Sequence, residues 1–143
     1  MRKFLLVIAA TFLMPLTAYA GALDWANGEW ALDPTQVNKD EQPEFRCGNE
    51  TLKTRITADN VYSYWWDNEK NIKHAKIISE SKTTLTIQYE GEERLMDNGK
   101  PHVWLMVFLD EDHFAWVRED WVVDGKIKGG TSIRIRCENA GVS

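Results

Sequence analysis

Residues 102–137 read HVWLMVFLDEDHFAWVREDWVVDGKIKGGTSIRIRC and decide the fold. Their apolar, β-branched and aromatic composition predicts three long antiparallel strands. An acidic turn, Asp110-Glu111-Asp112, separates the first two strands. An Asp124-Gly125 hairpin separates the second strand from the third, because a two-residue turn of this kind needs positive φ at both positions. This hairpin predicts three cross-strand pairs: Val123 with Lys126, Val122 with Ile127, and Trp121 with Lys128.

The rest of the chain predicts a meander of similar strands. Gly129-Gly130 predicts a bulge at which the last strand, residues 131–137, bends onto the other strands. Alternating apolar and polar residues predict strands at residues 28–30, 52–57, 61–66, 72–79 and 84–90, and Asn98-Gly99 predicts the turn before residues 102–109. Residues 33–45 contain two prolines and no apolar period, so we expect a long loop with at most one helical turn.

The number and order of these strands predict an all-β fold. About eight antiparallel strands, each joined to the next by a short turn, prefer to close because closure removes both exposed edges. We therefore expect a single up-and-down barrel, with a two-sheet β-sandwich as the alternative.

The first 20 residues have the features of a signal peptide. Arg2 and Lys3 supply positive charge, residues 4–14 supply an apolar core, and Ala18-Tyr19-Ala20 is an A-x-A cleavage site. The apolar run is too short to span a bilayer, and no later run is longer. We expect residues 1–20 to be removed and residues 21–143 to form one periplasmic or secreted barrel domain without a membrane span.

The charge and the cysteines narrow the functional classes. The chain has 17 basic and 22 acidic residues; without Arg2 and Lys3, 15 basic residues remain and the formal net charge is −7. We expect no nucleic-acid partner for such a chain, because phosphate binding needs a basic patch. Cys47 and Cys137 are the two cysteines of the sequence, and an oxidising compartment predicts a disulfide between them. Closing a loop of about 90 residues would stabilise the fold by roughly 4.5 kcal/mol.

Gly28-Glu29-Trp30 lies on the first strand of this expected meander. A G-x-W in that position resembles the calycin barrels, the lipocalins and avidin-like proteins, and the chain length without a C-terminal helix is similar to small bacterial lipocalin-like barrels. The resemblance implies that Trp30 plugs one end of the barrel and packs against Arg134 or Arg136, a cation-π contact of roughly 0.5–2 kcal/mol. It also implies a cavity for a small apolar ligand.

The disulfide raises a conflict with that stack. If Ile133 and Ile135 share the face of Cys137 and point into the core, Arg134 and Arg136 lie on the opposite face. An arginine would then have to reach across the barrel end to meet Trp30.

Aromatic residues are the main functional signal. Residues 103–109 and 61–66 are apolar on both faces, so one row on each strand points outward and needs a cover, either residues 33–45 or a second subunit in a homodimer. The inward row either fills the barrel or lines a ligand cavity, since eight strands lie near the limit at which side chains alone fill the interior. The expected ligand-binding residues are Tyr62, Tyr64, Trp66, Trp104, Met106, Phe108 and Trp116.

No pattern in the sequence predicts catalysis or metal binding. The three histidines, His74, His102 and His113, form no H-x-x-x-H or H-x-H pair, and the acidic turn lacks the spacing of a calcium loop. No G-x-S-x-G is present either. We expect a binding protein without enzymatic activity, cofactor or metal. Its ligand would be a small apolar or aromatic molecule.

A second function of a different class remains open. The charge of −7, a rigid barrel and an acidic hairpin tip suit an exported inhibitor or immunity protein that captures a basic enzyme such as lysozyme. The residues expected to bind such a partner are Asp110, Glu111 and Asp112.

Overall fold

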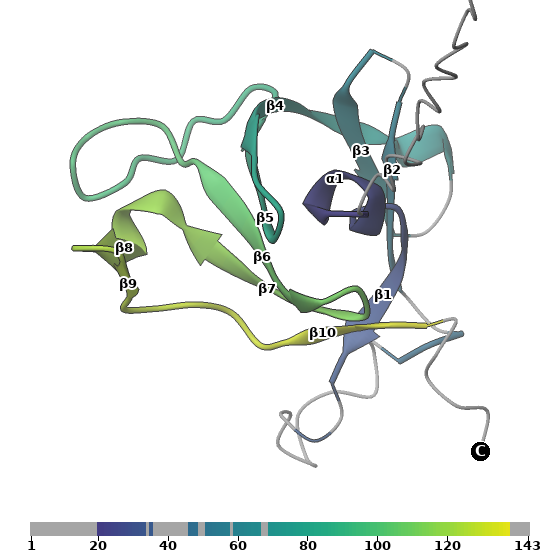
Figure 1. The fold of residues 1–143 in the computed structure, drawn as a ribbon. Coiled ribbons are helices and arrows are strands. Elements are labelled where there is room, and N and C mark those ends of the chain that lie inside the picture. The colour runs from purple at the N-terminus through teal and green to yellow at the C-terminus, as the bar shows by residue number, and fades with distance from the viewer. Residues whose placement is uncertain are drawn as a thin grey trace, which may run out of the picture.

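The computed structural model describes residues 20–33, 35, 46–48, 51–57, 59–66 and 69–137. Eight strands close into an antiparallel barrel in the order β1-β10-β7-β6-β5-β4-β3-β2, which confirms the expected all-β barrel (Figure 1). The barrel strands are β1 (Gly28–Leu32), β2 (Leu52–Ile56), β3 (Val61–Trp65), β4 (Lys73–Glu80), β5 (Thr84–Tyr89), β6 (Trp104–Asp110), β7 (His113–Arg118) and β10 (Arg134–Arg136). The expected signal peptide, apart from Ala20, and nearly all of the expected loop at residues 33–45 lie outside the described residues.

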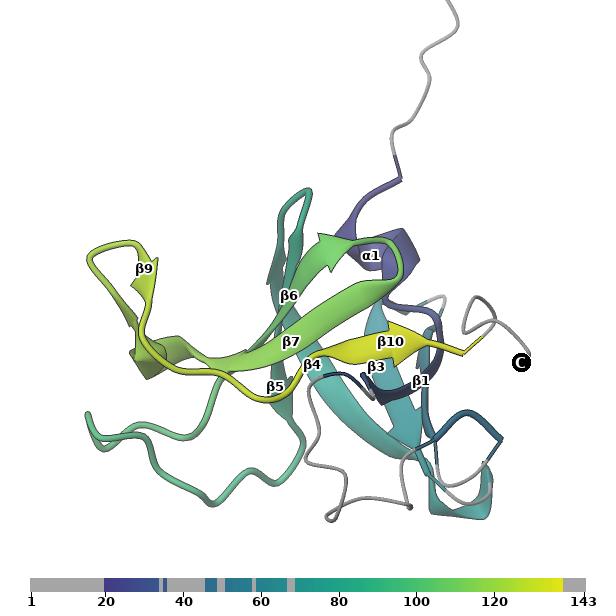
Figure 2. The same ribbon diagram turned by 90° about the horizontal axis from the view of Figure 1, so that it is seen from below.

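The strand β7 is shorter than the sequence predicts. It ends at Arg118, and a 3-10 turn, η2 (Glu119–Trp121), carries the chain out of the barrel. The hairpin β8 (Val122–Val123) and β9 (Lys126–Ile127) then forms a separate two-stranded sheet that projects from the barrel (Figure 2). The expectation of three long strands is therefore wrong at this point. The backbone N–H of Glu119 donates to the carbonyl of Val103, and this bond holds the turn against the start of β6.

The hairpin itself follows the expected register. Val122 pairs with Ile127 and Val123 with Lys126, while Lys128 N donates to Trp121 O at 2.7 Å. Asp124 and Gly125 both have positive φ, as a two-residue hairpin requires. Gly129 packs closely against the hairpin, since a Cβ there would lie 3.2 Å from the ring of Trp121.

The structure settles which strand faces point inward. On β6, Trp104, Met106 and Phe108 face the interior, and Leu105, Val107 and Leu109 face outward. The expectation for the last strand is wrong, since Arg134 and Arg136, rather than Ile133 and Ile135, face the interior. Arg136 is the register partner of Trp30, whose side chain is fully buried. Apolar alternation predicts the wrong inward face for this strand. It takes no account of the carbonyl oxygens and aromatic rings that can bind an arginine inside the barrel.

A short helix, α1 (Ala22–Trp25), closes one end of the barrel and lies within the ring of strands in Figure 1. Ala22 and Ala26 are fully buried, Ala22 N donates to Lys82 O at 3.0 Å, and Trp25 meets Phe108 edge to face at 5.8 Å. The sequence does not predict this helix, because four residues are too few to display a helical period.

The disulfide between Cys47 and Cys137 is present and confirms that prediction. Its Cα atoms lie 5.2 Å apart. Cys137 N also donates to Glu29 O at 2.8 Å, so the end of β10 is fixed both to β1 and to the segment that precedes β2.

Candidate functional site

Arg136 organises the closed end of the barrel. Its guanidinium lies 4.3 Å from the centroid of the Trp30 ring, so Arg136 rather than Arg134 occupies the stacking position. The same group donates to the carbonyl oxygens of Asn27 at 2.6 Å, Trp25 at 2.7 Å and Glu111 at 2.7 Å. Nε also donates to the Glu111 carbonyl at 3.2 Å, so each of the three guanidinium nitrogens has an acceptor. Arg136 therefore ties α1, β1 and the β6–β7 turn together.

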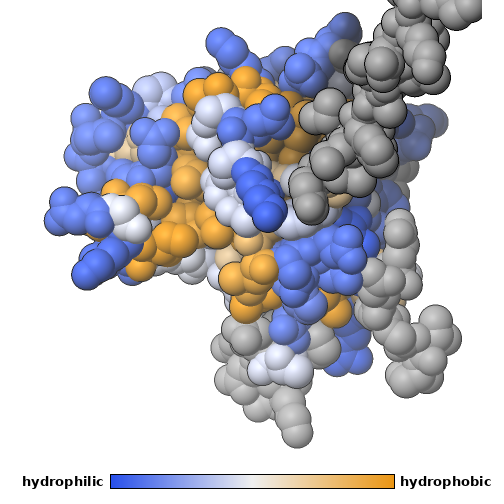
Figure 3. All heavy atoms as spheres, in the orientation of Figure 1, coloured by the Kyte–Doolittle hydropathy of each residue, from blue (hydrophilic) through white to orange (hydrophobic). Residues whose placement is uncertain are grey.

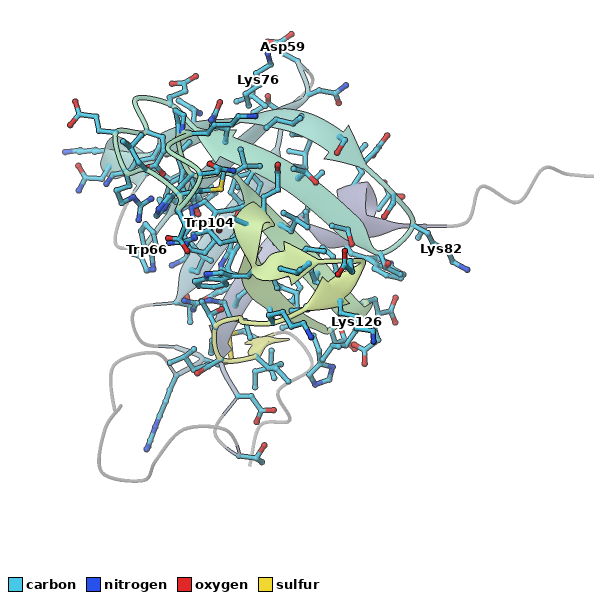
Figure 4. The ribbon with its side chains drawn as sticks, turned by 90° about the vertical axis from the view of Figure 1, so that its left-hand side faces the viewer. Asp59, Trp66, Lys76, Lys82, Trp104 and Lys126 are labelled. Atoms are coloured by element: carbon cyan, nitrogen blue, oxygen red, sulfur yellow. A yellow bond between two sulfur atoms is a disulfide. The ribbon has the colours of Figure 1, made fainter. Side chains whose placement is uncertain are left out.

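The opposite end of the barrel holds an open pocket of about 450 Å³. Figure 4 shows Trp66 and Trp104 at this end and Lys82, beside α1, at the other. Aromatic side chains form the walls, and charged side chains form the rim. The residues that line it are Tyr64, Trp66, Lys73, Tyr89, Glu90, Gly91, Glu92 and Arg94.

The rim carries a paired arginine. Arg94 donates to both carboxylate oxygens of Glu92, from Nε at 2.7 Å and from Nη2 at 2.6 Å. These hydrogen bonds from Arg94 lower the pKa of the Glu92 carboxyl. The Arg94 guanidinium also lies 6.0 Å from the Tyr89 ring and 5.9 Å from the Trp104 ring, so it covers the aromatic wall on this side.

The aromatic wall continues from the pocket into the barrel. Tyr64 meets Trp66 at 5.3 Å and Tyr89 at 5.0 Å between ring centroids. Tyr62 stacks on Tyr64 at 5.8 Å, and Trp116 meets Tyr62 edge to face at 6.1 Å. The pocket and the interior are thus connected by one continuous aromatic cluster.

The residues that the sequence predicts for ligand binding divide into three groups. Tyr64 and Trp66 line the pocket. Tyr62, Trp104 and Trp116 contact residues that line it. Met106 and Phe108 lie in the packed core, 0% and 3% exposed, and do not line it.

The sequence prediction missed Tyr89, Glu92 and Arg94. Tyr89 carried a usable signal, because it alternates with Leu85 and Ile87 on the inward face of β5. Glu92 and Arg94 follow that strand in an irregular segment, where no periodicity indicates which way a side chain points.

Arg134 lies in the barrel beyond this pocket. On β10 it is the register partner of Leu32 on one side and of Phe114 on the other. Its Nε and Nη1 atoms are buried and have no hydrogen-bond partner in the described part of the chain, and the same holds for the hydroxyl of Tyr62 and for Nε1 of Trp104. Arg134 interacts electrostatically with Tyr62 and Tyr89.

Burial shifts the pKa values of Arg134 and of the two tyrosines near it. It lowers the pKa of the Arg134 guanidinium, and the neighbouring Tyr62 and Tyr89 oppose that shift. Burial also raises the pKa of both the Tyr62 and the Tyr89 hydroxyls. At neutral pH both tyrosines keep their protons and can donate hydrogen bonds.

No protein-family model, curated protein or solved structure matches the chain. The barrel fold by itself does not define a function, since many unrelated activities share one fold. Within the described residues, no helix combines the length and apolar character needed to cross a membrane.

The acidic turn is engaged with its own surroundings. Asp110 Oδ1 lies 2.7 Å from His113 Nδ1, and Asp112 Oδ1 lies 3.2 Å from Arg136 Nε. The Glu111 carbonyl accepts a hydrogen bond from Arg136. Two of the three carboxylates thus already have basic partners, and capture of a basic enzyme by this turn stays a prediction.

The other histidines also have local partners. His74 Nδ1 lies 2.9 Å from Ser63 Oγ, and His102 Nε2 lies 3.2 Å from the Leu95 carbonyl. Over the described ranges, no three His, Cys, Asp or Glu side chains gather as a metal site would require.

The outward-facing apolar side chains of β3 and β6 are buried to different degrees. On β3, Trp65 is buried, and the Arg55 guanidinium lies 5.4 Å from the centroid of its ring. On β6, Leu109 is 63% exposed and faces Ile127 of the projecting hairpin across a shallow hollow of about 430 Å³. Apolar surface is visible on this side of the molecule as orange in Figure 3. A homodimer through this surface stays a prediction.

Proposed function

We propose that this chain is an exported, lipocalin-like barrel without enzymatic activity, and that it binds a small aromatic ligand at its open end. One observation carries the proposal: the barrel is plugged at the α1 end but has an aromatic-walled pocket of about 450 Å³ at the other end. Ligand sites of this kind combine apolar walls with a few polar groups that fix orientation.

The arrangement of the pocket favours an aromatic ligand. Tyr64 meets Trp66 at right angles, and Tyr89 is tilted against Tyr64, so the three rings present faces and edges in different directions. A flat ring can enter such a wall by offset or edge-to-face contact, worth about 0.5–1.5 kcal/mol per pair beyond the area buried. Trp66 is 37% exposed and has surface left to cover.

Tryptophan fluorescence provides the test. The wild-type protein is titrated with aromatic amides and acids, and the titrations are repeated with Trp66→Ala and with Leu109→Ala. Trp66→Ala removes a pocket wall, whereas Leu109→Ala removes exposed apolar surface on the outside of β6. We expect Trp66→Ala to weaken binding about tenfold and Leu109→Ala to leave it unchanged. Equal affinity of the wild type and Trp66→Ala would overturn the proposed site.

A further inference from the structure

Arg134 faces the interior behind the pocket, and no contact among the described residues explains why an arginine stabilises the fold there. Nε and Nη1 of Arg134 are buried without a hydrogen-bond partner, and no carboxylate forms an ion pair with it in the described ranges. Two nitrogens of a charged group that are removed from water without a hydrogen-bond partner destabilise the fold. Since folding alone favours an apolar residue at this position, the arginine indicates a partner that arrives from outside the chain.

We propose that Arg134 is the anchor for the carboxylate of the ligand, and that the ligand is a small aromatic or alkyl carboxylic acid. This inference rests on the proposed function and adds the chemical class of the ligand. The carboxylate would accept from Arg134, and the Tyr62 hydroxyl would donate to it as a neutral neighbour. The apolar body of the ligand would lie against Tyr64, Trp66 and Tyr89.

Four of the five unpaired atoms point to a ligand that accepts hydrogen bonds. Within the described residues, the buried side-chain atoms without partners are the Tyr62 hydroxyl, nitrogens of the His102 and Trp104 rings and two guanidinium nitrogens. The Tyr62 hydroxyl, Trp104 Nε1 and the two guanidinium nitrogens can donate, and none of the five atoms is a carboxylate or amide oxygen. The neutral His102 ring is the exception, because its Nε2 donates to the Leu95 carbonyl and leaves Nδ1 as an acceptor. A ligand that brings acceptors would satisfy the four donors, while a ligand that brings donors would not.

The number of charges favours a monoanion. Arg134 is the one cation of this interior group, because Arg94 is already paired with Glu92 and Arg136 is bonded at the closed end. A carboxylate neutralises one guanidinium and matches its planar geometry. A phosphate dianion would leave a net negative charge in a buried site, which is costly.

Ring contacts lead from the pocket towards Arg134. Tyr89 lines the pocket and lies 6.5 Å from Trp116 between ring centroids. Trp116 meets Phe114 at 5.3 Å, and Phe114 is the register partner of Arg134. Tyr89 is partly exposed, whereas Tyr62 is fully buried. The residue Arg134 itself keeps some accessible surface. We expect the Tyr89 ring to turn aside when the carboxylate enters.

The test uses matched acids and amides. The dissociation constant of the full chain is measured for each compound of three pairs: indole-3-acetate and indole-3-acetamide, cinnamate and cinnamamide, and octanoate and octanamide. Each amide keeps the shape of its acid but lacks the negative charge. We expect at least one acid to bind about tenfold more tightly than its amide, since hydrogen bonds to charged groups are stronger than those to neutral ones.

Variants of Arg134 separate the anchor from general charge effects. Arg134→Met should remove the preference for the acid and leave the affinity for the amide unchanged, and Arg134→Lys should retain part of the preference. Arg55→Met is the control, because it removes an arginine from the outer face of β2.

If the wild type binds acids and amides equally, or if Arg134→Met keeps the preference, the carboxylate anchor is wrong while the pocket stands. If no compound of the three pairs binds, both the pocket and the anchor are wrong.

Discussion

Arg134 and Arg136 lie two residues apart on one strand, face the same interior, and have opposite environments. Arg136 donates to three backbone carbonyls and stacks on Trp30. Arg134 has two buried nitrogens without any partner among the described residues. The comparison indicates two roles on one strand: Arg136 holds the closed end together, and Arg134 is held ready for a ligand.

The same division runs through the aromatic residues of the two ends. At the closed end, Trp30, Phe108 and Phe114 contact one another and are at most 3% exposed. At the open end, Trp66 and the residues beside it surround a pocket. Substitutions at the closed end should therefore change stability, whereas substitutions at the open end should change binding.

The largest effect is expected at Arg136. Arg136→Met leaves the carbonyls of Trp25, Asn27 and Glu111 without their donor and removes the stack on Trp30. The free energy of unfolding should fall by about 4 kcal/mol. Urea denaturation followed by tryptophan fluorescence measures this change. A loss no larger than that of Arg55→Met would contradict the structural role of Arg136.

The disulfide should have the next largest effect. Replacing both Cys47 and Cys137 by serine removes the link between the end of β10 and the segment before β2. We expect a loss of about 3 kcal/mol in the free energy of unfolding with an unchanged circular dichroism spectrum. Mass spectrometry of the protein purified without reductant, before and after reduction, is the direct check on the bond, and two free thiols in the untreated protein would refute it.

Arg134→Met should not lower the free energy of unfolding, in contrast to Arg136→Met. Replacing a buried charge that lacks a partner by an apolar side chain of similar length should leave the free energy of unfolding unchanged or raise it by about 1 kcal/mol. Urea denaturation of the ligand-free protein measures this difference. A loss as large as that expected for Arg136→Met would show that Arg134 also supports the fold.

The smallest effect on stability is expected from the ion pair between Glu92 and Arg94 at the rim of the pocket. The folded-state pKa of Glu92 is lower than its ordinary value of 4.5 because Arg94 donates hydrogen bonds to it. The folded state therefore prefers the ionised carboxylate. Its stabilisation is complete above pH 4.5 and is lost as the pH falls through the lower, folded-state pKa.

Glu92→Gln tests this pH dependence. The variant should be less stable than the wild type at neutral pH and should show a shallower loss of stability below pH 4.5. Urea denaturation over a series of acidic pH values provides the measurement. Parallel pH profiles of the two proteins would contradict the role of Glu92.

The sequence predicts the barrel and its covalent link because both depend on local signals. Alternation places the strands, the Asp124-Gly125 pair specifies its hairpin, and two cysteines leave one pairing. The failures occur where tertiary contacts override local pattern. The α1 helix is defined by burial against the barrel, η2 by a bond to Val103, and the inward face of β10 by acceptors for Arg136.

The candidate site was only partly predictable for the same reason. Tyr64 and Trp66 stand out as aromatics on a strand, and they line the pocket. The resemblance leaves Arg134 and Arg136 as alternatives for the stack on Trp30, and Arg136 fulfils that role. That two buried Arg134 nitrogens lack a partner among the described residues is a property of the assembled interior, and no spacing in the sequence reveals it.

Thermal unfolding of the wild type and of Arg134→Met, each with and without the tightest-binding carboxylate of the three pairs, tests the central claim most directly. Without ligand, Arg134→Met should be at least as stable as the wild type. With ligand at 100 times its Kd, the wild type should gain about 2.7 kcal/mol and become the more stable protein, because only the folded wild type binds the carboxylate tightly. If Arg134→Met is the less stable protein without ligand and the carboxylate stabilises both equally, Arg134 is a structural residue and the account is wrong.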